Sequence, residues 1–255
     1  PDGVEIETSD GKKYFGSIPP ATEPGKIAVS VAMASVERLS DGRYAAWFHD
    51  DGRFFAPGGS DERRFHVYQS LSADGGLTWA EPTVVTTRDD EHLCEPGVVR
   101  SPDGGTIALL LRENSRTRNS FVVFSTDEGA TWGEPLELPR ALTGDRHVAR
   151  YAPDGRLVVS FRDTAADSPT HGDWLLWVGT WGDVAERRPG AYRVRLMDNH
   201  HRGDCAYPGV ELLPDGTFVA TTYGHWTEGE QPYVVSVRFT LEELDARLPA
   251  AAGER

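Results

Sequence analysis

Side chains suited to acid–base, nucleophilic or anion-binding chemistry recur at two fixed places around four Asp-Gly pairs, which begin at Asp41, Asp103, Asp154 and Asp215. The first place lies eight residues before each Asp and holds Met33, Glu95, Arg146 and Tyr207. The second place ends the apolar run after each pair and holds His49-Asp50, Arg112-Glu113, Arg162-Asp163 and Tyr223-Gly224, with His225 next. Because these positions differ between copies that are otherwise alike, they are the candidates for function.

The arginines at these places predict a site for an anion. A guanidinium forms planar, bidentate, charge-assisted contacts with a carboxylate. Arg112, Arg146 and Arg162 gather in a chain with 26 Lys and Arg against 40 Asp and Glu, a net charge of −14. The alternative is that Arg112-Glu113 and Arg162-Asp163 are structural ion pairs along a rim.

The Asp-Gly pairs indicate how the two places come together. Asp-Gly between two apolar, β-branched runs is typical of a hairpin turn. The four pairs begin 62, 51 and 61 residues apart, so each copy predicts a hairpin in a repeated unit. A hairpin sets its first and last residues side by side, which predicts a ring of polar groups on one face of the repeat array.

A second motif completes the repeat. Ser-x-Asp-x-Gly-x-Thr-Trp occurs at residues 72–79 and 125–132, with a degenerate trace at Trp181-Gly182-Asp183. Hairpin plus hairpin makes a four-stranded antiparallel blade, and such units repeated radially make an all-β propeller. We expect a single propeller domain over residues 1–255, in which the first 30 residues, with Asp10-Gly11, supply part of a further blade. A capping box at Thr240 and Glu243 predicts a short C-terminal helix over about 240–248.

Composition excludes several classes of protein. A net charge of −14 argues against nucleic acid as the main partner, because a phosphate backbone requires a basic surface. No apolar run reaches the roughly 18–20 residues of a membrane span. No signal-peptide pattern is visible, and because the chain opens at Pro1 without Met, the compartment stays open between cytoplasm and secretion. The oligomeric state is also left open.

The Ser-x-Asp-x-Gly-x-Thr-Trp motif is the Asp box, and through it the chain resembles the sialidase superfamily of propellers, with BNR repeats, over most of residues 30–240. This resemblance implies six blades, with five as the alternative because 255 residues is short for six at this spacing. It implies a glycoside hydrolase in which a tyrosine attacks the anomeric carbon and a nearby glutamate deprotonates it. Tyr207 resembles the nucleophile, Glu95 its partner and Arg112 a substrate-binding arginine. The general acid is expected from the first blade, at Asp50 or Asp51.

One departure from the family keeps two other functions open. Sialidases carry Arg-Ile-Pro in the first blade, whereas residues 30–35 here read Ser-Val-Ala-Met-Ala-Ser. Arg146 or Arg162 then replaces the missing arginine, or the enzyme is a uronate lyase or rhamnosidase-like enzyme that uses His147 or His49 with a tyrosine. A non-catalytic glycan-binding propeller is the third alternative. The further candidate substrate-binding residues are Asp163, His49, Tyr223, His225 and Asp204.

Histidines and cysteines in the lead-in loops raise the question of a metal. His92, Cys94, His200, His201, Asp204 and Cys205 stand close to Glu95 or Tyr207 in sequence. Their spacing matches no specific zinc pattern. We therefore expect no metal and no cofactor, and two thiols that pack near the site, with a Cys94–Cys205 disulfide as the alternative.

Overall fold

The computed structural model describes residues 4–7, 13–16, 34–50, 64–201 and 203–248. The chain divides into two compact units, residues 1–30 and 31–255. In the first unit, β1 (Val4–Glu7) and β2 (Lys13–Gly16) form an antiparallel pair. The Asp10-Gly11 pair that connects them lies outside the described residues.

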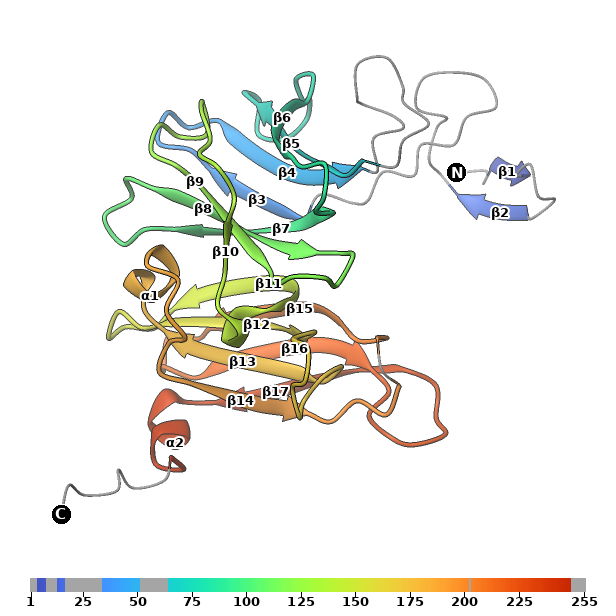
Figure 1. Cartoon of the computed structure of the whole chain (residues 1–255), viewed down its shortest axis with the longest axis vertical. Coiled ribbons are helices and arrows are strands. Elements are labelled where there is room, and N and C mark those ends of the chain that lie inside the picture. Colours follow the sequence, from blue (N-terminus) through green and yellow to red (C-terminus); the bar gives the residue numbers. More distant parts are fainter. Residues whose placement is uncertain (1–3, 8–12, 17–33, 51–63, 202, 249–255) are drawn as a thin grey trace. The chain divides into compact units, whose positions relative to one another are not determined.

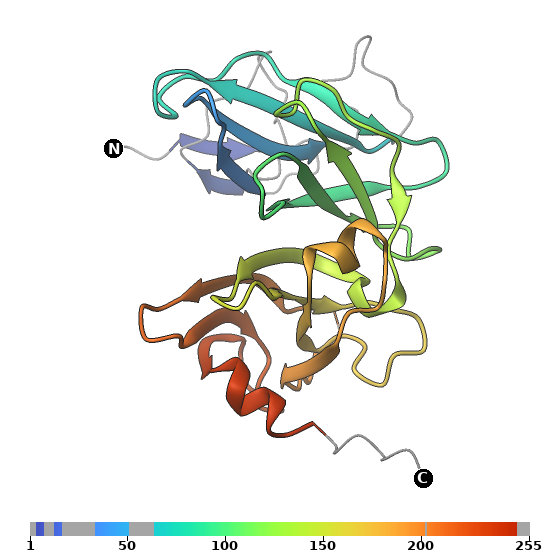
Figure 2. The same ribbon diagram turned by 90° about the vertical axis from the view of Figure 1, so that its left-hand side faces the viewer.

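The second unit consists of antiparallel sheets in chain order (Figures 1 and 2). Blade one contains β3 (Ser35–Arg38), β4 (Tyr44–Asp50), β5 (His66–Ser72) and β6 (Thr83–Thr87). Blade two contains β7 (Leu93–Arg100), β8 (Ile107–Glu113), β9 (Phe121–Ser125) and β10 (Leu136–Glu137). Blade three contains β11 (Gly144–Tyr151), β12 (Leu157–Asp163), β13 (Trp174–Gly179) and β14 (Tyr192–Met197). Blade four contains β15 (Ala206–Leu212), β16 (Phe218–Gly224) and β17 (Tyr233–Phe239).

These sheets are the blades of a propeller, so the predicted fold class is confirmed. The first strands of consecutive blades, β3, β7, β11 and β15, each contact the next. Four such sheets lie within the described residues of the second unit, and the expected total of six or five blades stays a prediction. None of the described helices is both long and apolar enough to cross a membrane.

The second strand of blade two, β8, is apolar on both faces because blades one and three cover it. Side chains alternate sides along a strand. In β8, Ile107, Leu109 and Leu111 pack with blade one, whereas Ala108 and Leu110 pack with blade three. The continuous run Ile-Ala-Leu-Leu-Leu therefore fills two cores at once.

All four predicted hairpins form, and the same contact closes each turn. The carboxylates of Asp41, Asp103, Asp154 and Asp215 each accept a hydrogen bond, 2.9–3.0 Å long, from the backbone N–H two residues later. The glycine that follows each Asp has a φ between +77° and +90°, a conformation that favours residues without a Cβ.

The Asp boxes connect the third and fourth strands of blades one and two. Ser72 Oγ accepts from Gly76 N at 2.8 Å, and the Asp74 carboxylate accepts from both the backbone and the hydroxyl of Thr78 at 2.9 and 2.6 Å. Bonds to Thr78 and Ser72 lower the pKa of Asp74 to about 2. The same bonds recur in the second box, which Ser125 begins.

Helices replace the box in the later blades. The trace at Trp181-Gly182-Asp183, interpreted above as a degenerate box, folds as helix α1 (Trp181–Ala185) between β13 and β14. Helix α2 (Leu241–Asp245) follows β17. Both begin with a reciprocal capping box, in which an N-cap threonine and an acid three residues later satisfy each other's backbone N–H. A 3₁₀ turn, η1 (Arg140–Leu142), precedes β11.

The two boxes provide a matched pair of glycines for a stability prediction. Gly76 and Gly129 both have φ near +90°, but a Cβ on Gly129 would lie 2.5 Å from Gln69 Oε1, whereas one on Gly76 has Trp79 at 3.6 Å as its nearest contact. Gln69 cannot move freely, because it is buried and accepts from Trp47 Nε1 at 2.9 Å. We expect Gly76→Ala to cost about 1–2 kcal/mol through backbone strain and Gly129→Ala about 1–3 kcal/mol more through overpacking. Urea unfolding of both variants checks this, and equal losses would contradict the packing argument.

Candidate functional site

The three described inner-strand candidates occupy the same irregularity in three consecutive blades. Glu95, Arg146 and Tyr207 have left-handed backbones, with φ of +51°, +58° and +63°. At each one the strand register shifts by one residue, as in a β-bulge. A bulge re-aims a side chain, and a left-handed conformation in a residue with a Cβ costs about 1–3 kcal/mol. Three strained bulges at one place in the repeat indicate a functional position.

The two places that the repeat alignment joined are paired across each hairpin. The residue before each bulge lies opposite the end of the second strand. The pairs are Cys94 with Arg112, Asp145 with Arg162, and Ala206 with Tyr223. The predicted proximity of the two places therefore holds in blades two, three and four.

Glu95 is buried and held by two arginines. Arg112 Nη1 donates to its Oε1 at 2.6 Å, and Arg146 Nε lies 3.4 Å from its Oε2. The backbone N–H of Glu95 donates to His49 Nδ1 at 3.2 Å. Within the described part of the chain, Oε2 makes no hydrogen bond, although it is buried. The charged partner of this oxygen is therefore the Arg146 guanidinium.

Arg146 also contacts Tyr207. Its guanidinium carbon lies 4.1 Å from the centroid of the Tyr207 ring, in a cation–π contact. Tyr207 is 58% exposed and stacks at 6.2 Å on Tyr223. A single guanidinium thus bridges the buried carboxylate and the accessible tyrosine.

Asp145 anchors the arginines beneath these groups. This fully buried carboxylate takes bonds of 2.6 and 2.8 Å from Arg116, contacts Arg112 Nε at 3.2 Å, and accepts from Arg162 Nε at 3.0 Å. Burial alone would raise the pKa of Asp145, but the Arg116 bond and the charges of Arg112 and Arg162 outweigh burial and lower it. Asp145 therefore stays ionised.

We name this group the arginine cluster; its members are Arg112, Arg116, Arg146, Arg162, Glu95 and Asp145. It holds four guanidiniums against two carboxylates, a surplus of two positive charges. Its arginine side chains range from 10% exposed at Arg162 to 34% at Arg116. The cluster is therefore electrostatically suited to an anion.

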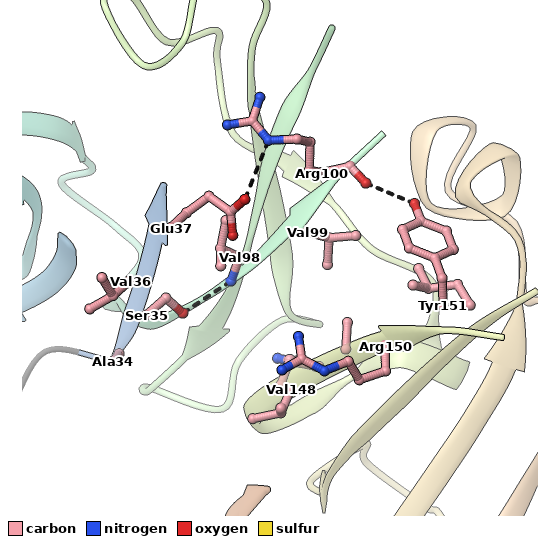
Figure 3. A pocket seen from close by; sticks show the side chains of 13 residues that line it. Ala34, Ser35, Val36, Glu37, Val98, Val99, Arg100, Val148, Arg150 and Tyr151 are labelled. Carbon is pink, nitrogen blue, oxygen red and sulfur yellow. Dashed lines mark hydrogen bonds and ion pairs between the residues drawn. The ribbon is translucent and has the colours of Figure 1, made fainter. Parts of the chain in front are cut away.

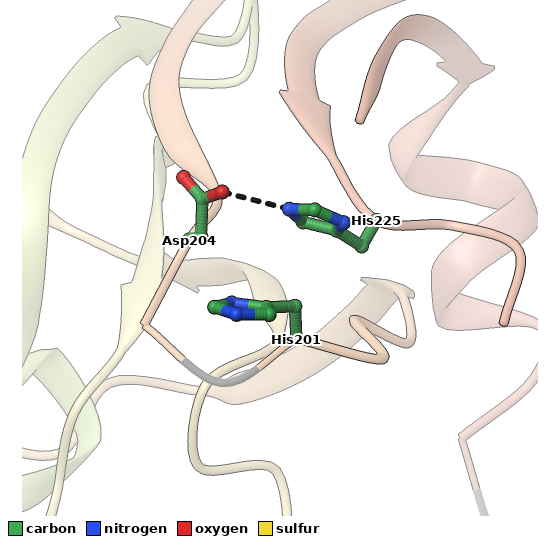
Figure 4. Close-up of side chains that lie close together, drawn as sticks. All are labelled: His201, Asp204 and His225. Atoms are coloured by element: carbon green, nitrogen blue, oxygen red, sulfur yellow. Dashed lines mark hydrogen bonds and ion pairs between the residues drawn. The ribbon is translucent and has the colours of Figure 1, made fainter. Parts of the chain in front are cut away.

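A histidine–carboxylate pair adjoins the tyrosines. The Tyr223 hydroxyl donates to Asp204 Oδ1 at 2.9 Å, and His225 Nε2 lies 2.7 Å from Asp204 Oδ2. His201 stacks on the His225 ring at 4.7 Å (Figure 4). Bonds from His225 and Tyr223 lower the pKa of Asp204, whereas burial and Asp204 raise the pKa of Tyr223 to about 12.

A separate cavity of about 350 Å³ lies between β3, β7 and β11 (Figure 3). Its walls are mostly small and aliphatic, with Arg100 Nε 3.5 Å from Glu37 and the Tyr151 hydroxyl donating to Arg100 O at 2.8 Å. Among the sequence candidates, His147 lines it, whereas Glu95, Arg146 and Tyr207 do not. The candidate site is therefore the group at the bulges.

Comparison with known proteins identifies the family to which the chain belongs. The model of the BNR repeat-like domain matches residues 39–219, which is more than half of the chain and includes Glu95, Arg146 and Tyr207. The chain belongs to the BNR repeat-like domain family. No curated protein matches it.

Solved structures share the fold of this BNR domain at low sequence identity. A protein of unknown function from Dyadobacter fermentans has a TM-score of 0.66 at 19% identity, covering 92% of this chain and 62% of its own. NanB sialidase from Streptococcus pneumoniae has a TM-score of 0.58 at 15% identity, covering 90% of this chain and 34% of its own. The intramolecular trans-sialidase from Ruminococcus gnavus, solved with oseltamivir carboxylate, has a TM-score of 0.54 at 16% identity, covering 83% and 44%. The BNR domain thus spans less than two thirds of each of these proteins.

Two sequence candidates in the BNR domain, Asp163 and His147, make their hydrogen bonds to residues outside the arginine cluster. Asp163 is fully buried and accepts from Ala165 N, Thr170 and Arg193, so it holds a loop of blade three together. His147 is buried, with Nε2 2.9 Å from Leu142 O, and burial lowers its pKa to about 4. Its ring stacks on Phe161.

Of the candidates in the first blade, the structure describes His49 and Asp50. His49 is buried and contacts Glu95 through the backbone bond described above, and it stacks on Phe65 at 5.9 Å. Asp50 is buried beside Tyr68, whose pKa is raised by burial and by the Asp50 carboxylate. Asp51 and Met33 lie outside the described residues. In the place of the missing first-blade arginine, Ser35 Oγ bridges to blade two, donating to Pro96 O and accepting from Val98 N.

Sequence reasoning missed Asp145, Arg116 and the approach of His201 to His225. Asp145 had a usable signal, because a charged residue stands directly before the bulge where the other repeats have Cys94 and Ala206. Arg116 lies in the loop after β8, outside the aligned positions.

Both cysteines are buried and free. Burial raises the pKa of the Cys94 thiol and raises that of the Cys205 thiol to about 12, so both are packed thiols.

Proposed function

We propose that this BNR domain is a sialidase-like exo-glycoside hydrolase that acts on a carboxylated sugar. One observation carries the proposal: Arg146 contacts both Glu95 and Tyr207, and all three stand at the same bulge of adjacent inner strands. The arrangement joins an accessible nucleophile, a buried base and a cation in one site.

The charge of the arginine cluster supports an anionic substrate. Its surplus of two positive charges stands in a chain of net charge −14, so it is a local feature. Arginine forks recognise carboxylates in bidentate geometry. The R. gnavus enzyme of the same fold binds a ligand named as a carboxylate, which agrees with this substrate class.

The proposed reaction has two steps. In the first, the Tyr207 oxygen bonds to the anomeric carbon, its proton passes to the Glu95 carboxylate, and the glycosidic C–O bond breaks as an acid protonates the leaving oxygen. In the second, water attacks the anomeric carbon and gives a proton to the carboxylate left by the acid, while the bond from that carbon to the Tyr207 oxygen breaks and the oxygen takes back the proton held by Glu95. The positive charge of Arg146 stabilises negative charge that develops on the phenol oxygen. The acid remains assigned to Asp50 or Asp51.

Hydrolysis is better supported than elimination. A uronate lyase that used His147 would need that ring to exchange protons with a substrate, but it is buried in the blade and bonded to Leu142 O. The non-catalytic alternative assigns no role to a buried Glu95 that is joined through Arg146 to an exposed tyrosine.

A substrate panel tests the proposal. Sialosides, other ulosonates, uronosides and rhamnosides are incubated with the protein, and reducing sugar and ultraviolet absorbance are followed together. We expect release of a carboxylated sugar without a rise in absorbance. Rising absorbance would instead show an unsaturated product of elimination, and tight binding without turnover across the panel would show a lectin.

The role of Arg146 gives a further expected result. Arg146→Met keeps the chain length and removes the charge, so kcat/KM on the best carboxylated substrate should fall about 100-fold, as for loss of a charge-assisted contact. Arg150→Met is the matched control, because Arg150 lies on the same strand in an exposed pair with Glu211. The control should stay within about twofold of the parent; equal losses in both variants would refute the role of Arg146.

A further inference from the structure

We propose that His201, Asp204 and His225 form a binding site for a divalent transition-metal ion, with zinc as the best-fitting ion. One ligand atom from each residue lies within 4.8 Å of the others. His201 and Asp204 come from the loop before β15, and His225 comes directly after β16 (Figure 4). No step of the proposed hydrolysis involves these three residues, so the metal site does not depend on that proposal.

The backbone holds the three residues in place. Asp204 N donates to His201 O at 3.2 Å, which closes a turn that brings these two side chains together. The loop is joined to the end of β16, because His200 N donates to His225 O at 2.9 Å.

A buried amide completes this framework. The Asn199 side chain accepts from His225 N at 3.0 Å and donates to His201 O at 2.6 Å. It is only 5% exposed and so ties both histidine backbones to one fixed group. The ligand set is therefore pre-organised.

The side chains need only small movements to ligate an ion. His225 Nε2 and Asp204 Oδ2 face each other 2.7 Å apart, so each needs to move only slightly to bind the same ion. The other carboxylate oxygen already accepts from Tyr223, the type of outer contact that fixes a ligating carboxylate. His201 is exposed and can turn its ring without disturbing the core.

The chemistry of the donors selects the ion. Two imidazoles and one carboxylate suit zinc and its first-row neighbours, whereas calcium and magnesium prefer oxygen ligands alone. Three protein ligands leave a tetrahedral ion one position for water or a substrate oxygen. Tyr223 connects this position to the candidate site, since it bonds Asp204 and stacks on Tyr207.

Zinc binding to the whole protein tests the site. Chelator-stripped protein is titrated with ZnCl₂ against a chromogenic competitor, and cobalt is added separately to record its visible absorption bands. We expect one zinc bound per chain by the parent. His201→Ala and Asp204→Asn should each weaken zinc binding at least about 10-fold and change the cobalt bands.

His200→Ala is the matched control, because it removes a neighbouring imidazole that lies outside the cluster; it should bind zinc as the parent does. Circular dichroism confirms that each variant is folded, and the exposed position of His201 makes that variant the decisive one. Absence of zinc binding in the parent would overturn the proposal, as would binding that survives His201→Ala and Asp204→Asn undiminished or is lost equally in His200→Ala.

Discussion

Tyr207→Phe is expected to lower kcat on the best carboxylated glycoside by about 10³-fold or more, because it removes the oxygen that attacks the anomeric carbon. The ring itself remains, so its contacts with Arg146 and Tyr223 persist and the site keeps its shape. Substrate binding should therefore change little. Initial rates and calorimetric binding to the same substrate separate these two effects.

Tyr233→Phe is the control for this loss. Tyr233 is also partly exposed, but it lies on β17 and its hydroxyl contacts only Thr227 among the residues described. This variant should hydrolyse the substrate at the parent rate. A Tyr207→Phe protein that retained the parent kcat would rule out the tyrosine as nucleophile.

Asp145→Asn is expected to destabilise the fold by about 3–5 kcal/mol, since removing one partner of a buried ion pair leaves its partners uncompensated. Three guanidiniums, those of Arg112, Arg116 and Arg162, converge on this carboxylate. Urea unfolding at neutral pH measures the loss. Glu211→Gln, which breaks an exposed pair with Arg150, is the control and should cost under about 1 kcal/mol.

The pH dependence of this difference follows from the direction of the pKa shift. The arginines lower the pKa of Asp145 in the folded state, so the stabilisation is fully present above about pH 4, the ordinary value for an aspartate. It is lost as the pH falls through the lowered value. The gap in stability between parent and Asp145→Asn should therefore narrow only in acid; a constant gap would contradict the electrostatic account.

The repeat pattern in the sequence predicted most of the fold. Asp-Gly between apolar runs predicted all four hairpins, because the turn needs a carboxylate acceptor and a glycine with positive φ, and both are visible in the residue types. The same alignment paired Arg112, Arg162 and Tyr223 with the residues next to Glu95, Arg146 and Tyr207. Local turn chemistry thus positioned much of the candidate site.

The remaining features depend on contacts between repeats. The three bulges have no glycine that would signal them in the sequence. Glu95, Arg146 and Tyr207 adopt a positive φ there although each carries a Cβ. Asp145 meets Arg116 across 29 residues, and His225 meets Asp204 across 21, so neither contact has a local signal. The Trp181 segment illustrates the opposite error: its Trp-Gly-Asp resembled a box, but the Thr180 cap and Asp183 favour a helix.

Covalent trapping at Tyr207 tests the central claim most directly. The protein is incubated with a glycosyl fluoride of its best substrate that carries a second fluorine beside the anomeric carbon, which slows breakdown of the glycosyl–enzyme by destabilising its oxocarbenium-like transition state. The digested protein is then analysed by mass spectrometry. We predict one added sugar on the peptide that contains Tyr207, and none in Tyr207→Phe. A sugar attached to a carboxylate, or an unmodified Tyr207 peptide from fully inactivated protein, would contradict the account.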